Sequence, residues 1–287
     1  AYSLLKNRKG LDNDAMAVVF DEWNGGELDS FLIEITANIL RFRDEDGKPL
    51  LDKILDVAGQ KGTGKWSAIA AMDENDPLTL ITEAVYARLL SALYPERIKA
   101  ASLYSGKLKV ESGKLSDNAQ LSIEDVRQAL YAAKLISYAQ GFSLLRHASE
   151  HYGWDLDYGT IARIWRKGCI IRSVFLQKIT EAYRKDPDLE NLLFDDFFHT
   201  KIQEALPAWR RVVAEGALSG VALPAMSSAL NYFDGLRTLY SAANMIQAQR
   251  DYFGAHTYER TDRERGHFFH TNWTGEGGNT VSGTYSV

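Results

Sequence analysis

The sequence predicts an all-α protein. Apolar residues recur at helical spacing along most of the 287 residues, and no alternating run of any length predicts a strand. Only six prolines interrupt the chain, and its hydrophobic and charged fractions, 45% and 25%, are those of an ordinary globular protein. From these observations we expect two similar multi-helix repeats followed by an extended C-terminal tail.

The repeats are expected at roughly 12–120 and 155–260, within one helical domain of residues 1–260. Aromatic and proline landmarks of the first half return in the second half in the same order, at offsets between 142 and 147. The matching pairs are Trp23 and Trp165, Phe31 and Phe175, Trp66 and Trp209, and Pro77 and Pro224. A steady offset of this kind favours a duplicated helical unit.

The first predicted helices follow directly from apolar spacing. Ala1 opens a short helical pattern, and Asp12 or Asn13 can cap a second helix that runs to about Trp23. Residues 27–44 predict an amphipathic helix. Its expected buried stripe is Leu28, Phe31, Leu32, Ile35, Ile39 and Phe42. Residues 50–58 predict another helix, with charged residues on its outer side.

The middle of the chain predicts longer, more apolar helices. Asp76 is expected to cap a helix over 78–93, in which Arg88 needs an anionic partner, either a carboxylate or a ligand. Residues 106–120 are polar and predict a surface loop. Ser122 and Asp125 then open a long helix that ends near Tyr152 and is apolar nearly all round, so we expect it to be central.

The second half ends in a helix and a tail. Asp195 and Asp196 predict a helix start, and residues 244–258 predict the last helix. Arg250 and His256 lie six positions apart on it, so the helix end is expected to bend between them. Residues 261–287 are charged, then aromatic, then rich in Gly, Ser and Thr. We expect this tail to dock on a second copy of the protein, with packing on its own chain as the alternative.

Residues 58–66 carry the main signal for function. This turn combines three glycines with Lys61, Thr63 and Lys65. Glycines leave backbone N–H groups unshielded and lysines add positive charge, so such a turn is suited to hold a phosphate at a helix N-terminus. The second repeat has Ala205-Leu206-Pro207-Ala208-Trp209 at this place, so the helix is repeated but the anion-binding chemistry is not.

Two other interpretations of the glycine turn exist. Gly59 to Lys65 matches a nucleotide P-loop up to the last position, where Trp66 replaces the Ser or Thr that holds Mg²⁺. The preceding residues also have helical rather than strand spacing, so we do not expect an NTPase. A purely structural helix–helix turn with solvated lysines stays open on the residues alone.

Bulk properties exclude several classes of function. The net charge of −5 gives no basic field for nucleic acid or an anionic membrane. The single cysteine, Cys169, excludes an internal disulfide framework and fits a reducing compartment, so we expect a cytoplasmic protein and a core cysteine. No run predicts a membrane span. His147 and His151 have metal-ligand spacing, but no third ligand accompanies them, so no metal site is expected.

Three motifs together resemble a known family. They are Lys61-Gly62-Thr63-Gly64-Lys65-Trp66, Cys169-Ile170-Ile171-Arg172 and the stretch Ile246-Gln247-Ala248-Gln249-Arg250-Asp251-Tyr252-Phe253-Gly254-Ala255-His256. The chain resembles the C-terminal helical domain of decarboxylating 6-phosphogluconate dehydrogenase over essentially its whole length. The resemblance implies two helical repeats, a homodimer and a tail that threads into the partner subunit.

The resemblance also implies roles for five residues. Lys61, Thr63 and Arg88 would bind the phosphate of 6-phosphogluconate, while Arg250 and His256 would reach into the partner's site, Arg250 to the phosphate. Arg and Lys with a hydroxyl are well suited to a phosphate dianion. Arg172 is expected to make a structural ion pair rather than to act in catalysis.

Two departures from the family pattern matter. The family's dinucleotide-binding domain, which binds NADP, has no counterpart here, because no glycine-rich strand–turn–helix is present. Its catalytic lysine and glutamate lie upstream of residue 1, so no catalytic residue is expected in this chain. We therefore expect the substrate-binding and dimerisation part of the enzyme, inactive as a dehydrogenase by itself. The alternative is a non-catalytic helical dimerisation module that binds at most a sugar phosphate.

Overall fold

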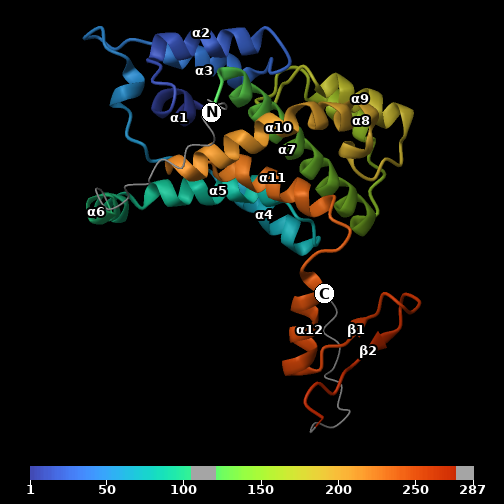
Figure 1. Cartoon of the computed structure of the whole chain (residues 1–287). Helices are drawn as coiled ribbons and strands as arrows, with labels where there is room; N and C mark the ends of the chain where they lie inside the picture. The colour runs from blue at the N-terminus through green and yellow to red at the C-terminus, as the bar shows by residue number, and fades with distance from the viewer. Residues whose placement is uncertain (105–120, 276–287) are drawn as a thin grey trace. The chain divides into compact units, whose positions relative to one another are not determined.

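The chain is helical, as the sequence predicts. A computed structural model describes residues 1–104 and 121–275 and is drawn in Figure 1. The chain separates into two compact units, Ala1–Phe233 and a second unit that begins at Asp234. The predicted loop at 106–120 and the end of the tail, 276–287, lie outside the described residues.

The elements of the first unit are α1 (Tyr2–Asn7), α2 (Asn13–Asn24), α3 (Phe31–Arg41), η1 (Leu50–Lys53), α4 (Thr63–Asp73), α5 (Thr79–Ala92), α6 (Tyr94–Tyr104), α7 (Ile123–Tyr152), α8 (Tyr158–Ile164), α9 (Leu176–Lys185), η2 (Leu192–Phe194), α10 (Asp196–Ser219) and most of α11 (Pro224–Leu236). The second unit contains α12 (Ala243–Gly254) and a short antiparallel pair of strands, β1 (Tyr258–Glu259) and β2 (Phe268–Phe269).

Helix α7 is the centre of the first unit, as predicted. Ser122 and Asp125 form a complete capping box at its N-terminus, which satisfies backbone donors that the helix itself cannot. Helix α10 runs along α7, and α5 packs on the same helix (Figure 1). The core between these helices includes the fully buried side chains of Phe142, Phe198 and Trp209.

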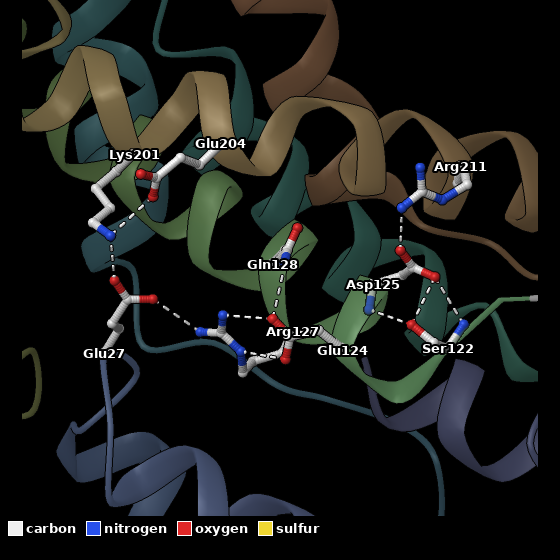
Figure 2. A network of polar contacts seen from close by, with 9 residues as sticks. All are labelled: Glu27, Ser122, Glu124, Asp125, Arg127, Gln128, Lys201, Glu204 and Arg211. Atoms are coloured by element: carbon white, nitrogen blue, oxygen red, sulfur yellow. Dashed lines mark hydrogen bonds and ion pairs between the residues drawn. The ribbon is translucent and has the colours of Figure 1, made fainter.

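Ion pairs fasten the N-terminal part of α7 to its neighbours (Figure 2). Arg211 of α10 donates to the Asp125 carboxylate. Glu27 accepts from Lys201 of α10 at 2.8 Å and from Arg127 of α7 at 3.0 Å. Burial by itself would raise the pKa of Glu27, but the two cations outweigh it and hold that pKa below its usual value.

Two helix pairs support the predicted duplication, which stays a prediction. Helices α2 and α3 pack together, as do α8 and α9 (Figure 1). An antiparallel bridge joins Ser30, just before α3, to Ser173, just before α9. These positions are 143 apart, within the range of the repeat offsets, and a local two-fold relation would produce such a contact. Arg172 beside the bridge pairs with Glu34 at 2.5 Å, which confirms its structural role.

The predicted helix at 50–58 is wrong. Only the single turn η1 forms, and the chain is irregular from Ile54 onward. Ile54 and Leu55 are 57% and 58% exposed. A short helix is stable in water only when a face is buried, and these residues have no such face in the described structure.

The predicted inner face of the third helix is also wrong. Helix α3 spans 31–41 rather than 27–44 and buries Ile33, Ala37 and Leu40. Of the predicted stripe, Leu28 is buried, whereas Leu32 and Phe42 are 50% and 58% exposed. Because apolar residues occupy both sides of this helix, spacing alone could not say which side faces inward.

Asp76 does not cap the next helix, contrary to expectation. Its carboxylate accepts hydrogen bonds from Ser143 Oγ at 2.7 Å and from the Nδ1 of His147 at 2.8 Å, both on α7. The N-terminus of α5 is satisfied instead by Gln140, whose Oε1 accepts from the Leu80 N–H at 3.0 Å. These contacts fix α5 against α7.

Three further residues singled out in the sequence are Asp195, Cys169 and His151. Asp195 caps α10, as predicted. Cys169 is partly buried rather than a core residue. His151 bonds to Glu74 at 2.8 Å, and the described residues contain no group of three candidate metal ligands. None of the helices in residues 1–104 and 121–275 is long and apolar enough to cross a membrane.

The described part of the tail packs on its own chain. Strand β1 pairs with β2, a small sheet that the sequence did not predict. The fully buried Asp251 of α12 accepts from His270 Nδ1 at 2.8 Å, from the Thr271 N–H at 3.0 Å and from Trp273 Nε1 at 2.8 Å. These contacts hold residues 270–273 against α12.

Candidate functional site

The glycine turn ends where α4 begins. Gly62 has φ 102°, a left-handed conformation that favours glycine. The Trp66 ring lies over it, since a Cβ added to Gly62 would stand 3.4 Å from the indole Cζ2. Thr63 is the first residue of α4, and no side chain at the N-cap position bonds to the N-terminal N–H groups of this helix. These groups carry the positive end of the helix dipole.

Helices α4 and α5 approach closely just after this turn. A Cβ added to Gly64 would stand 2.7 Å from Cγ2 of Val85, closer than real Cβ contacts. Glycine at this position therefore lets the first turn of α4 lie against α5. Val85 is three residues before Arg88 on α5, so the close approach brings Arg88 near the turn.

Hydrogen bonds fasten the turn to α5. The guanidinium of Arg88 donates to the Gly59 carbonyl. The Ala58 N–H donates to Ser91 Oγ at 2.9 Å, and this hydroxyl donates to the Arg88 carbonyl at 2.7 Å. The structure thus brings the Arg88 side chain to the same turn that carries Lys61 and Thr63.

The three side chains of this set are accessible. Lys61, Thr63 and Arg88 are all exposed. Arg88 contacts a carbonyl oxygen rather than the carboxylate or ligand that the sequence predicts, because Gly59 presents its backbone without a covering side chain. An ammonium, a hydroxyl, a guanidinium and helix N–H groups together can hold an anion with several acceptor oxygens. The residues directly before α4, from Ile54 to Gly62, are irregular in the structure.

The second set of predicted residues lies at the end of α12. The helix ends at Gly254, and Ala255 takes φ 50°, so the chain turns between Arg250 and His256 as predicted. Both side chains are half-buried. Arg250 Nη1 donates to the Oε1 of Gln247 at 3.0 Å.

The five predicted residues fall into two groups. Lys61, Thr63 and Arg88 belong to the first unit, and Arg250 and His256 belong to the second. Within each unit the structure gathers the predicted residues at one helix end.

Sequence reasoning missed two residues that support these groups. Ser91 anchors the glycine turn and Gln247 contacts Arg250. Each carried a weak signal: Ser91 is a small hydroxyl in a mostly apolar helix, and Gln247 lies three residues before an arginine. The signal at Ser91 identifies no partner, because its contact with Ala58 joins distant parts of the chain.

Comparison with known proteins gives one consistent result. The family model described as 6-phosphogluconate dehydrogenase, C-terminal domain, matches residues 1–273. Over the whole chain, 54% of residues are identical to the decarboxylating 6-phosphogluconate dehydrogenase of Rattus norvegicus. Identity to the enzyme of the same name from Cunninghamella elegans is 55% over 286 residues. The chain spans 59% of the rat protein and 58% of the fungal one.

A solved structure has the same fold. The chain is similar to Plasmodium falciparum 6-phosphogluconate dehydrogenase with a TM-score of 0.89 and 42% sequence identity. The match covers 95% of this chain and 58% of the other. That enzyme is described in its apo form, in complex with its cofactor NADP+ and in complex with its substrate 6-phosphogluconate.

Proposed function

This chain belongs to the 6-phosphogluconate dehydrogenase family, and from that premise we propose that it is the substrate-binding and dimerisation part of the decarboxylating enzyme. The whole enzyme would oxidise 6-phosphogluconate at C3 with NADP⁺, release CO₂ and protonate the product to ribulose 5-phosphate. This chain would hold the phosphate end of the substrate.

The contact of Arg88 with the glycine turn carries this proposal. It joins Arg88 to the turn of Lys61 and Thr63, at the uncovered N-terminus of α4. A phosphate dianion accepts charge-assisted hydrogen bonds from such donors, which are shorter and stronger than neutral ones. Arg88 would exchange the Gly59 carbonyl for phosphate oxygens, since a full negative charge attracts a guanidinium more strongly than a carbonyl dipole does.

The described residues do not fit NADP. A dinucleotide-binding domain needs parallel strands and a glycine-rich strand-to-helix turn, whereas residues 1–104 and 121–275 contain one strand pair of two residues each. We therefore assign NADP to another part of the whole enzyme and derive no hydride-transfer step here. We expect the chain alone to form no NADPH from 6-phosphogluconate.

A homodimer is part of the proposal. Helices α4 and α5 each bury only one side chain, Ala71 and Leu80 respectively, although both are rich in apolar residues. Trp66, Met72 and Leu90 on these helices are 66%, 65% and 61% exposed. Exposed apolar area on this scale is typical of a protein interface, and a second copy is its simplest occupant.

The dimer would complete the phosphate site. Arg250 and His256 of one copy would reach the glycine turn of the other, and α12 with the tail packed on it would be exchanged together between copies. Arg250 would add a second guanidinium to the phosphate, and His256 would hydrogen-bond a sugar hydroxyl or the phosphate. The lone cysteine supports a reducing compartment, so we place the protein in the cytoplasm.

Calorimetric titration tests the proposal. The chain should bind 6-phosphogluconate and bind gluconate, which lacks the phosphate, far more weakly. Lys61→Ala should weaken binding of the phosphorylated sugar, whereas Lys167→Ala, at an exposed lysine outside both sets, should leave it unchanged. Equal affinity for the two sugars would contradict a phosphate site.

A second candidate function is a non-catalytic helical dimerisation module that binds at most a sugar phosphate. The exposed apolar faces of α4 and α5 favour it independently of the glycine turn. Sedimentation and calorimetry together separate simple dimerisation from substrate binding. Dimers that bind no 6-phosphogluconate would support a module that only dimerises, and dimers whose binding is weakened by Lys61→Ala would support the substrate-binding part.

A further inference from the structure

Helix α12 contains, at Gln247, a side chain that contacts both predicted ligand-binding residues. Gln247 Oε1 accepts from Arg250 Nη1 at 3.0 Å. Its Nε2 donates to the Thr257 carbonyl at 2.7 Å and to the His256 carbonyl at 3.3 Å. A guanidinium only donates and a carbonyl only accepts, so these partners admit one orientation of the amide.

We propose that Gln247 is a positioning residue that sets the Arg250 guanidinium and the His256 backbone in one fixed arrangement for the phosphorylated substrate. This inference rests on the proposed function. It adds that Gln247 acts through its two neighbours, without touching the substrate itself.

A neutral amide is suited to this task. The amide oxygen orients the guanidinium by a hydrogen bond but leaves its positive charge unneutralised, so the charge remains available to a phosphate. A glutamate at 247 would pair with Arg250 as an ion pair and would present no donor to the His256 and Thr257 carbonyls. Asp251, which follows Arg250 in the chain, accepts its hydrogen bonds from His270, Thr271 and Trp273.

Gly254 contributes to the same arrangement through space. A Cβ added to Gly254 would stand 2.8 Å from both Cδ2 and Nε2 of His256, so the imidazole lies directly over this glycine. The obstructed atoms belong to the far end of a side chain. Gly254→Ala should therefore move the His256 ring without displacing the Arg250–Gln247 pair.

The experiment measures 6-phosphogluconate binding to the whole chain by calorimetry. Gln247→Met keeps the length of the side chain and removes both functions of the amide, while Gln247→Glu keeps only the acceptor. The matched control is Gln249→Met, at an exposed glutamine on the same helix. We expect about tenfold weaker binding for Gln247→Met, from the loss of a hydrogen bond to a charged group. Gln247→Glu should also weaken binding, because its carboxylate would neutralise the Arg250 charge and offers no donor to the two carbonyls. The control should bind as the wild-type chain does.

A second readout separates positioning from folding. The His256 ring resonances in ¹H–¹³C NMR spectra should shift in Gln247→Met and in Gly254→Ala but stay in place in Gln249→Met, with the thermal unfolding midpoint of each variant recorded alongside. If the wild-type chain binds 6-phosphogluconate and the affinity of Gln247→Met is within twofold of the wild-type affinity, this inference is overturned but the proposed function is not. A wild-type chain that binds no 6-phosphogluconate would overturn the proposed function as well.

Discussion

Gly64→Ala tests whether the close approach of α4 and α5 shapes the glycine turn. The added Cβ would stand 2.7 Å from Cγ2 of Val85, and the β-branched valine has little rotamer freedom on a helix to move away. Overpacking of this kind costs about 1–3 kcal/mol, and the better helix propensity of alanine returns at most about 1 kcal/mol. We expect a net loss of about 1 kcal/mol and a fall of ~2 °C in the unfolding midpoint.

The same substitution should weaken substrate binding, because relief of the contact with Val85 moves α4 away from α5 and thereby moves Thr63 away from Arg88. Gly141→Ala on α7 is the matched control, since Gly141 is also helical and a Cβ there meets nothing within 4 Å. Adding Val85→Ala to Gly64→Ala removes the obstructing methyl groups and should restore both stability and binding. Calorimetry and urea unfolding check each variant. Gly64→Ala and Gly141→Ala with the same stability and affinity would refute the packing argument.

Three further predictions concern polar side chains of the first unit, of which Gln140 is buried and Glu27 and Lys134 are partly buried. Gln140→Leu leaves the Leu80 N–H without its acceptor and should lower the free energy of unfolding by about 1–3 kcal/mol, measured by urea titration. The pKa of Glu27 is lowered in the folded state, so its ion pairs stabilise the fold at pH values above its unfolded pKa and are lost as the pH falls. Glu27→Gln, which lacks this titrating group, should therefore lose less stability than the wild-type chain during acid titration. Burial lowers the pKa of Lys134 from 10.5 to about 8. Between these two pH values the unfolded chain binds more protons than the folded chain, so the free energy of unfolding should rise with pH, by up to about 3 kcal/mol. Lys134→Met should flatten that rise in unfolding measurements at pH 8 and pH 10; an unchanged slope would contradict it.

Helix α7 was predictable because its signals are local. Its capping residues Ser122 and Asp125 are three apart in the sequence, and its apolar character extends around the whole helix. The predictions were wrong where a contact with a distant part of the chain determines the local structure. Asp76 precedes a helix and was assigned to it, yet its carboxylate contacts Ser143 and His147 on α7. No spacing near residue 76 contains that information.

The candidate site shows the same division. The glycine turn and the bend after Arg250 were predictable, because glycine, lysine and helix-end patterns are local. The residues that hold these two groups in place could not be predicted. Ser91 is recognisable only once α5 is placed against the turn, and Gln247 only once the chain beyond Gly254 folds back over the end of α12.

Mixing two defective variants tests the central claim, a phosphate site shared between two copies. Lys61→Ala and Arg250→Ala should each abolish tight binding of 6-phosphogluconate. If subunits exchange between dimers, about half of the dimers contain one copy of each variant. If each site takes residues from both copies, one of the two sites in such a mixed dimer has both Lys61 and Arg250. About a quarter of all sites should therefore bind again. Recovery of that size is the result the account predicts. No recovery, in a mixture shown by mass spectrometry to contain mixed dimers, would contradict it.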